Sequence, residues 1–346
     1  MAQDAAPRLF VVAHNRNHVS IFGDAAKLVR ERGYAVSFVV VEDHPDREAA
    51  ASSATAIGFP IIETAELERT ATARDAVLVG CDWGPKPFIG KIERMRRRGI
   101  CFIGAVEGAR FAYPRHYERV DDLLVWGQSG LDTLPGRKHV VGSPAIERAR
   151  KPDRVQPERP HVLINYKFTK GAMEQGPVWA RACAEAAKQI DPNYVLSAHP
   201  SNVADLAGLN VSHAPFGALL EKATLMITRS STVIYEALAG RVSVIYFPIE
   251  GERRAEFGDA LGAFETAESA DDVARYVREH AAAPAFNEAA AEAFLAWHIS
   301  FDPARSSPER MADFITSKLA ERRDFEPNQS PKLDIGVLWR WMTARG

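Results

Sequence analysis

The segment Leu225–Leu238, LMITRSSTVIYEAL, joins a short apolar run to a helical pattern and indicates how the chain folds. Leu225–Thr228 has the continuous apolar character of a strand covered on both faces. A helix is predicted over Thr232–Ala239, directly after the polar residues Arg229–Ser231. A strand that leads straight into a helix is the repeating unit of a doubly wound parallel sheet.

The same alternation continues on both sides of this segment. Further strands are predicted at Leu9–Ala13, Val36–Val41, Ala76–Val79, Ile100–Ile103, Leu123–Trp126, His139–Val141, Val162–Asn165, Tyr194–Ala198 and Val244–Phe247. Residues 148–161 interrupt the pattern with three prolines and many charges, which is typical of a linker. We therefore predict a first Rossmann-like domain over 1–150 and a second over 151–330. The tail, 331–346, is expected to pack back on the first domain.

Composition narrows the class of protein. The 346 residues suit two domains, and 46% hydrophobic residues are enough for two cores. A net charge of −2 argues against a nucleic-acid partner. The three cysteines lack CxxC spacing, which argues against disulfides and structural zinc: Cys81, Cys101 and Cys183. The N-terminus does not resemble a signal peptide, so we expect a cytoplasmic protein.

The polar residues after Thr228 form a predicted anion site. Arg229, Ser230, Ser231 and Thr232 lie between the carboxyl end of a strand and a helix N-terminus. Backbone N–H groups and hydroxyls at such a point bind phosphate, and Arg229 adds a full charge. The alternative is that Ser231 or Thr232 only caps the helix.

His199 and Pro200 follow the predicted strand Tyr194–Ala198, so they are expected at the same edge of the second sheet. A histidine in this position can donate a hydrogen bond to a diphosphate or assist a leaving group. The alternative is a loop histidine held by the proline that follows it.

Several of these residues resemble the signature of a group of bacterial transferases. His199-Pro200 followed by Ser230–Thr232 and Glu236 is similar to the pattern of CDP-glycerol glycerophosphotransferases, capsule polymer transferases and polysialyltransferases. Three further stretches resemble the glycerophosphotransferases: Leu124–Gln128, Val141–Pro144 and Phe301–Arg310. The similarity covers mainly residues 120–315. Arg229 departs from it, because the family often has an acid or a serine there.

The resemblance implies a GT-B fold, with two Rossmann-like domains facing a central cleft. It implies that the second domain binds a nucleotide diphosphate or monophosphate donor through Lys167, His199, Arg229, Ser230, Ser231, Thr232 and Glu236. Lys167 or Lys170 would neutralise the phosphates and Tyr166 would stack on the base; two solvated lysines are the alternative. It implies no cofactor and no metal, since the sequence also lacks an Asp-x-Asp pair.

The first domain is then expected to supply a base that takes a proton from the acceptor hydroxyl. His14 and His18, in the loop expected after the first strand, and Asp82, after the third, are the candidates. Glu107 is a weaker candidate. For each of them the alternative is a capping or turn residue.

The predicted function is a metal-independent transferase that moves a glycosyl or polyol-phosphate group to a saccharide or lipid-linked acceptor in cell-surface polymer synthesis. One alternative is a nucleotide-sugar 2-epimerase, although that group typically has Asp-Ser-Gly-Gly where this chain has Arg229–Thr232. Another is a non-catalytic nucleotide-sugar-binding subunit. The basic stretch Lys91–Arg98 is interpreted as a solvated helix end, with peripheral contact at the inner face of the cell membrane as the alternative.

Overall fold

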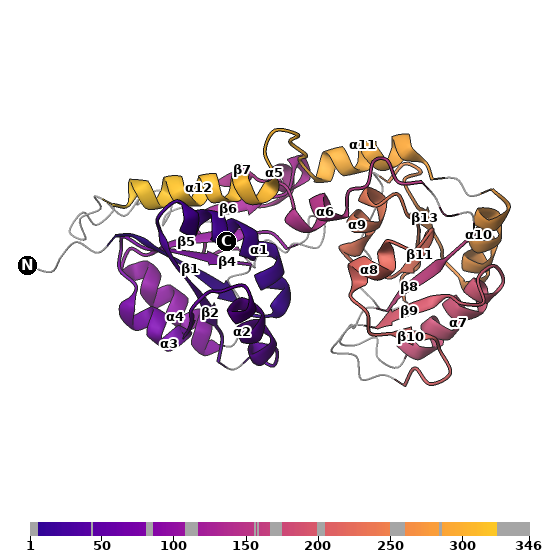
Figure 1. Ribbon diagram of the computed structural model, residues 1–346, viewed down its shortest axis with the longest axis horizontal. Coiled ribbons are helices and arrows are strands. Elements are labelled where there is room, and N and C mark those ends of the chain that lie inside the picture. Colours follow the sequence, from indigo (N-terminus) through magenta and orange to yellow (C-terminus); the bar gives the residue numbers. More distant parts are fainter. Residues whose placement is uncertain are drawn as a thin grey trace, which may run out of the picture.

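The computed structural model describes residues 6–42, 44–80, 86–107, 117–155, 157, 159–166, 175–198, 205–249, 260–283 and 286–323. These residues form two α/β units, each built on a parallel sheet (Figure 1). The described parts of the two sheets share no strand, and residues 141–161 connect them.

The first sheet has the strand order β3-β2-β1-β4-β5-β6-β7, with every neighbouring pair parallel. Its strands are β1 (Arg8–Ala13), β2 (Ala35–Val40), β3 (Ile61–Glu63), β4 (Ala76–Val79), β5 (Cys101–Ala105), β6 (Asp122–Val125) and β7 (Lys138–Val140). The order reverses between β1 and β4. In open α/β sheets ligands bind outside the carboxyl ends of the strands at such a switch point.

Helices cover both faces of the first sheet because successive side chains of each strand point to opposite faces. Leu9 and Val11 point toward one face, whereas Phe10 and Val12 point toward the other. The first face is covered by α1 (Arg16–Glu31), α2 (Arg47–Ala56) and α12 (Ser307–Glu321). The second face is covered by α3 (Thr64–Thr70) and α4 (Lys86–Arg97).

The position of α12 corrects the predicted domain boundary. Residues 151–330 were expected in the second domain, but Met311, Ile315 and Leu319 lie in the core of the first (Figure 1). Their spacing of four residues forms an apolar stripe, which packs beside α1. The chain therefore returns to the first domain before residue 307. The tail 331–346 lies outside the described residues.

The second sheet has the order β10-β9-β8-β11-β12-β13 and is also parallel. Its strands are β8 (Val162–Tyr166), β9 (Val195–Ala198), β10 (Val211–Ser212), β11 (Leu225–Thr228), β12 (Ser243–Tyr246) and β13 (Glu265–Thr266). One face is covered by α7 (Gly176–Lys188) and α10 (Ala270–Ala282). The other is covered by α8 (Phe216–Leu220), α9 (Val233–Ala239) and α11 (Glu288–His298).

A continuous hydrophobic cluster joins the two domains. Trp126, at the end of β6, meets Tyr235 of α9 edge to face, with ring centroids 6.2 Å apart. Tyr235 stacks on Phe294 of α11 at 5.4 Å, and both rings are buried. His298 Nδ1 lies 2.9 Å from Ser129 Oγ of α5 (Gln128–Thr133), a second buried contact between the domains.

The linker is fixed to the second domain. The Arg154 guanidinium donates hydrogen bonds to the carbonyl oxygens of Gly240, Glu221 and Ala223 at 2.8, 2.9 and 2.7 Å. The preceding helix, α6 (Pro144–Ala149), is tied to α12 because Glu147 accepts a 2.9 Å bond from Arg310. The connection thus consists of packed and hydrogen-bonded segments.

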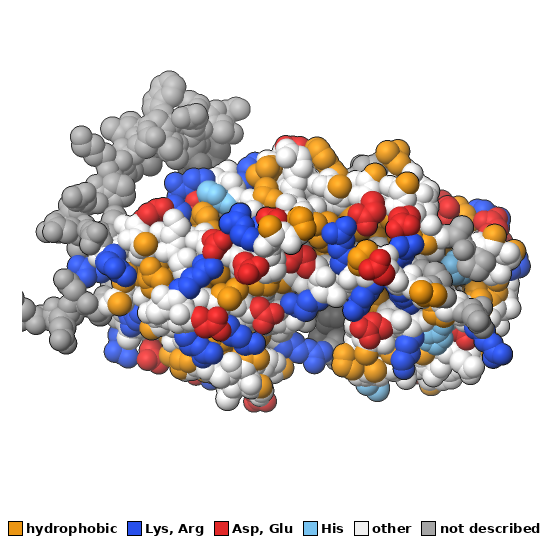
Figure 2. Space-filling model, turned by 45° about the horizontal axis from the view of Figure 1, so that its top comes forward, with side chains coloured by type: hydrophobic (Ala, Val, Ile, Leu, Met, Phe, Trp, Pro, Cys, Tyr) orange, Lys and Arg blue, Asp and Glu red, His pale blue; other side chains and the backbone are white. Residues whose placement is uncertain are grey.

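The surface carries both signs of charge. Figure 2 shows Lys and Arg side chains interspersed with Asp and Glu over the face in view. At the basic end of α4, Arg94 pairs with Glu68 and Arg96 with Asp121. These pairs agree with a solvated helix end. Among the described residues, every helix is too short or too polar to cross a membrane.

Candidate functional site

The carboxyl ends of three neighbouring strands define a site in the first domain. His14 follows β1, Gly80 follows β4, and Glu107 lies two residues beyond β5. Because β4 pairs in parallel with both β1 and β5, all three positions lie at one edge of the sheet. This edge includes the switch point between β1 and β4.

His18 reaches this edge from the first turn of α1. Asn15 caps the helix, and its Oδ1 accepts the His18 N–H at 3.1 Å. The helix therefore begins at Arg16, so His18 belongs to the helix and not to the loop expected after the first strand. Its imidazole is directed inward and is only 1% exposed.

Both ring nitrogens of His18 have partners. Nε2 lies 2.7 Å from Glu107 Oε1, and Nδ1 lies 3.3 Å from the backbone nitrogen of His14. Since an ionised carboxylate can only accept, Nε2 carries the proton and donates it to Glu107. In the neutral ring, Nδ1 then accepts from the His14 N–H. The Glu107 side chain is 37% exposed, so the carboxylate is the member of this pair that solvent or substrate can reach.

Electrostatics favour a proton on His18. Burial lowers the pKa of its imidazole, but the Glu107 carboxylate, through its charge and its hydrogen bond, acts in the opposite direction together with the Val12 carbonyl. The net result is a pKa raised above the ordinary value for histidine. Glu107 therefore faces a donor that holds its proton and fixes one carboxylate oxygen.

His14 is packed among rings. Its imidazole is 4% exposed and lies edge-on to Phe88, His44 and His18, with centroids 5.1, 5.9 and 5.4 Å away. The structure thus brings His14, His18 and Glu107 together and adds His44, which the sequence analysis missed. His44 lies a few residues beyond β2, so the rule that ligand-facing residues follow strands would have found it.

Gly80 makes room for the pair of Glu107 and His18. A Cβ atom at this position would lie 2.8 Å from Glu107 Oε1 and from His18 Nε2. We predict that Gly80→Ala displaces one partner and lowers turnover by about a hundredfold, the cost of a misplacement on the order of 1 Å. Steady-state kinetics measure this loss. Gly217→Ala is the control, since a Cβ there has no neighbour within 4 Å; equal kinetics for both variants would contradict the prediction.

The second domain has its own switch point between β8 and β11. There Asn165 Nδ2 donates to Thr228 Oγ1 at 2.8 Å, which links the two strand ends. Ser230 Oγ lies 2.9 Å from the Tyr246 hydroxyl, and the Arg229 side chain is 1% exposed. Arg229 and Ser230 therefore lie at the predicted edge, and both are buried.

The capping alternative has little support in the geometry. α9 begins at Val233, one residue later than predicted, and the Thr232 side chain makes no capping hydrogen bond. Ser231 Oγ accepts from the Val233 N–H only at 3.4 Å. The sequence at this helix start is therefore not explained by capping alone.

An alternative role for Arg229 is to pair with a carboxylate such as Glu236 and hold the loop in place. Burial raises the pKa of the Tyr166 phenol and of the Cys183 thiol, and the Arg229 charge opposes both shifts. The guanidinium therefore lies near the end of β8 and near α7. The charge that acts on Glu236 comes from Arg148 of α6.

Burial raises the pKa of Glu236 to about 7, with Arg148 opposing the shift. Arg148 also hydrogen-bonds to Ser20 of α1, with distances of 3.4 Å to the carbonyl oxygen and 3.3 Å to Oγ. α6 therefore connects Glu236 in the second domain with the helix that carries His18.

This raised pKa predicts a pH-dependent stability. Because the folded-state pKa of Glu236 lies above its ordinary value, its contribution to stability is present at low pH and is lost as the pH rises through about 7. His18, whose pKa is also raised, acts in the same direction. We expect the wild type to lose more melting temperature between pH 5.5 and 8 than Glu236→Gln. An equal fall in melting temperature for the wild type and Glu236→Gln between these two pH values would refute the prediction.

The remaining predicted residues lie outside the described part of the chain: Asp82, Lys167, Lys170, His199 and Pro200. Within the described ranges, no group of three or more His, Cys, Asp or Glu side chains is placed to hold a metal ion.

No protein-family model and no curated protein matches the sequence. Solved structures do match over nearly the whole chain. A putative UDP-N-acetylglucosamine 2-epimerase from Listeria monocytogenes has a TM-score of 0.62 at 11% identity, covering 94% of this chain and 99% of that one. The spinosyn forosaminyltransferase SpnP has a TM-score of 0.59 at 15% identity, covering 91% and 100%. MurG from Acinetobacter baumannii has a TM-score of 0.56 at 13% identity, covering 90% and 100%.

These likenesses confirm the predicted fold, an α/β fold of the GT-B type with two parallel-sheet domains. They include both glycosyltransferases and 2-epimerases. The narrower resemblance to CDP-glycerol glycerophosphotransferases stays a prediction.

Proposed function

We propose that this protein transfers a glycosyl unit from a nucleotide-activated donor to a saccharide or lipid-linked acceptor, with Glu107 as the base. The observation that carries the proposal is the carboxylate of Glu107, partly exposed and held by buried His18 at the edge of the first sheet. His18 itself is a poor candidate for direct contact, because both of its ring nitrogens are engaged, one by Glu107 and the other by the His14 backbone. It acts as a positioning residue.

Glu107 accepts the proton of the acceptor hydroxyl through the oxygen that His18 does not hold. The hydroxyl oxygen forms a bond to the anomeric carbon of the sugar, and the bond from that carbon to the phosphate oxygen breaks. The electron pair leaves with the diphosphate, whose charge must be stabilised by donors in the second domain.

We assign donor binding to the predicted set in the second domain. Arg229, Ser230, Ser231 and Thr232 follow a strand at the switch point, which supports this assignment. Lys167, His199 and Glu236 complete the proposed set. Among similar structures, VinC holds dTDP and the 2-epimerase of Neisseria meningitidis holds UDP-GlcNAc. We propose that the reaction needs no metal or other cofactor, which activity in excess EDTA would test.

For Arg229 the expected effect follows from one charge-assisted bond. Such a bond to phosphate is worth about 1.5–3 kcal/mol, so Arg229→Ala should weaken nucleoside-diphosphate binding by roughly ten- to a hundredfold. Arg229→Lys should recover part of the lost affinity, because lysine keeps the positive charge but lacks the planar guanidinium group that donates two hydrogen bonds at once. Calorimetric titration beside a melting curve tests this. If only the melting temperature falls, Arg229 supports the loop and does not bind the phosphate.

Turnover of a panel of CDP-, UDP-, dTDP-, GDP- and CMP-linked donors tests the function as a whole. Slow hydrolysis without acceptor, quickened by a saccharide, supports a transferase, and a preference for CDP-glycerol would support the polyol-phosphate branch. A donor whose sugar changes configuration supports the second candidate, a 2-epimerase, in which Glu107 would remove a proton from a sugar carbon. Binding without turnover supports a non-catalytic subunit. We propose that the protein works in the cytoplasm, and use of a lipid-linked acceptor would support contact with the inner face of the cell membrane.

A further inference from the structure

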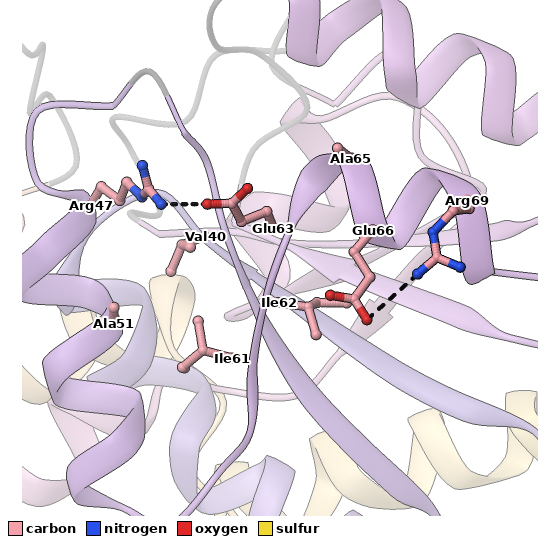
Figure 3. A pocket seen from close by; sticks show the side chains of 9 residues that line it. All are labelled: Val40, Arg47, Ala51, Ile61, Ile62, Glu63, Ala65, Glu66 and Arg69. Atoms are coloured by element: carbon pink, nitrogen blue, oxygen red, sulfur yellow. Dashed lines mark hydrogen bonds and ion pairs between the residues drawn. The ribbon is translucent and has the colours of Figure 1, made fainter.

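A cavity of about 590 Å³ lies along the open edge of the first sheet (Figure 3). It borders β3, which pairs with β2 and ends the described sheet. α2 and α3 flank it on the two sides. Its volume is within the range of small-molecule sites, about 300–1,000 Å³. Its floor is aliphatic and is formed from both sides of β3: Val40, Ala51 and Ile61 on the α2 side, and Ile62 and Ala65 on the α3 side.

The rim of this cavity, here called the β3 pocket, is polar and electrically balanced. Arg47 pairs with Glu63, and Arg69 lies 4.0 Å from Glu66, so two guanidinium groups face two carboxylates (Figure 3). The four side chains remain 42–73% exposed and are able to turn toward a ligand. A balanced rim gives no net attraction to an anion or a cation, while it supplies both donors and acceptors.

The backbone of β3 adds further polar groups. Phe38 donates its N–H to the Pro60 carbonyl at 2.9 Å, so Pro60 faces β2. Since successive residues of a strand alternate, the N–H and C=O groups of Ile61 and Glu63 point away from β2, toward the pocket. A strand of three residues offers too short an edge for stable pairing with an extended peptide. The pocket therefore suits a small ligand better than a strand.

We propose that the β3 pocket binds an uncharged sugar unit of the acceptor, an inference that rests on the function proposed above. A neutral sugar presents a C–H face to the aliphatic floor and hydroxyls to the rim and to the strand edge. A phosphate or a carboxylate would meet Glu63 and Glu66, and an ammonium group would meet Arg47 and Arg69.

The position of the pocket sets the length of the acceptor. β2 ends at Val40 and β3 ends at Glu63. Both residues therefore lie at the carboxyl ends of the strands, on the same side of the sheet as Glu107. Four strand spacings separate β3 from β5, or about 19 Å at ~4.8 Å each. This span exceeds one sugar ring, so a unit in the pocket and a hydroxyl at Glu107 belong to an oligosaccharide. Between them lie His14 and His44, whose rings are 5.9 Å apart.

Direct binding of defined glycans tests the inference. The probes are neutral oligomers of glucose, galactose, mannose and N-acetylglucosamine with one to four units, beside their uronic-acid and 6-phosphate counterparts. We expect a neutral oligomer to bind the wild type, and Ala51→Trp, which fills the floor, to weaken its affinity at least about tenfold. Ser52→Trp, on the exposed side of α2, is the matched control and should keep wild-type affinity.

A second variant guards against misfolding of Ala51→Trp. The double variant Arg47→Ala/Glu63→Ala removes one rim pair of exposed side chains and should also weaken neutral-glycan binding by about tenfold. The inference is overturned if no neutral oligomer binds, if the charged counterparts bind more tightly, or if both variants keep wild-type affinity.

The experiment separates this inference from the proposed function. If the wild type binds a neutral oligomer through the pocket but turns over no nucleotide sugar, the glycan site is supported and the transferase function is refuted. A working transferase whose acceptor affinity is unchanged in both Ala51→Trp and Arg47→Ala/Glu63→Ala would refute the glycan site and keep the transferase function.

Discussion

Replacing Glu107 with Gln is expected to lower kcat for glycosyl transfer by about 10²–10⁴-fold, the usual contribution of a general base. Glutamine keeps the shape of the side chain and an oxygen that can accept from His18 Nε2, which lies 2.7 Å from Glu107 Oε1. It removes the oxygen that takes the proton. Because Glu107 is proposed to act on the acceptor, the affinity for nucleoside diphosphate should stay near that of the wild type. Steady-state kinetics together with calorimetric titration measure both quantities.

Four further variants serve as comparisons for Glu107→Gln. Glu31→Gln, at an exposed position of α1, is the matched control and should leave kcat unchanged. His18→Ala should lower kcat less than Glu107→Gln does. It should also shift the pH profile of kcat, because Glu107 loses the hydrogen bond that the His18 imidazole donates. Full activity in Glu107→Gln would show that another residue is the base. His14→Ala and Asp82→Asn would then test two other candidates predicted from the sequence.

Replacing Tyr235 with Ala is expected to lower the free energy of unfolding by about 3–5 kcal/mol, as for other buried aromatic residues. The ring is 0% exposed, stacks on Phe294, and meets Trp126 and His298 edge to face. Its removal opens a cavity at the centre of the contact between the domains. Denaturant unfolding followed by fluorescence and circular dichroism measures the change.

The control for Tyr235→Ala is Trp297→Ala. Trp297 is a large ring on α11 that is 45% exposed, and its loss should change the free energy of unfolding by less than about 1 kcal/mol. Because Tyr235 belongs to a core that both domains share, we expect one transition that shifts as a whole. Two separate transitions, with only one of them moved, would show that the shared cluster does not couple the domains.

The sequence predicted the strands with strong apolar character. Ala76–Val79 and Leu225–Thr228 have the expected bounds, since both are short apolar runs buried on two faces. The strands β3, β10 and β13 were missed because two or three half-exposed or exposed residues give no buried apolar run. Edge strands need little burial, so hydrophobic patterning does not mark them.

The candidate site was only partly predictable. Glu107 was given the least weight, because a carboxylate after a strand resembles a turn residue. Its contact with His18 depends on three facts that are distant in the sequence: β4 lies between β1 and β5, α1 begins at Arg16, and Gly80 has no side chain. The position of α12 was missed for a similar reason, since an apolar stripe fits any sheet of suitable shape.

The return of α12 to the first sheet makes the second domain an insertion within the first in terms of chain connectivity. A donor domain from a relative could therefore be grafted only by cutting twice, in the linker after α6 and again between α11 and α12. A single crossover would pair α12 with a foreign α1. Such a chimera would also have to keep Trp126 complementary to the residue that replaces Tyr235. Recombination at these two points, with that contact retained, is the route by which a different second domain could be combined with the existing first domain.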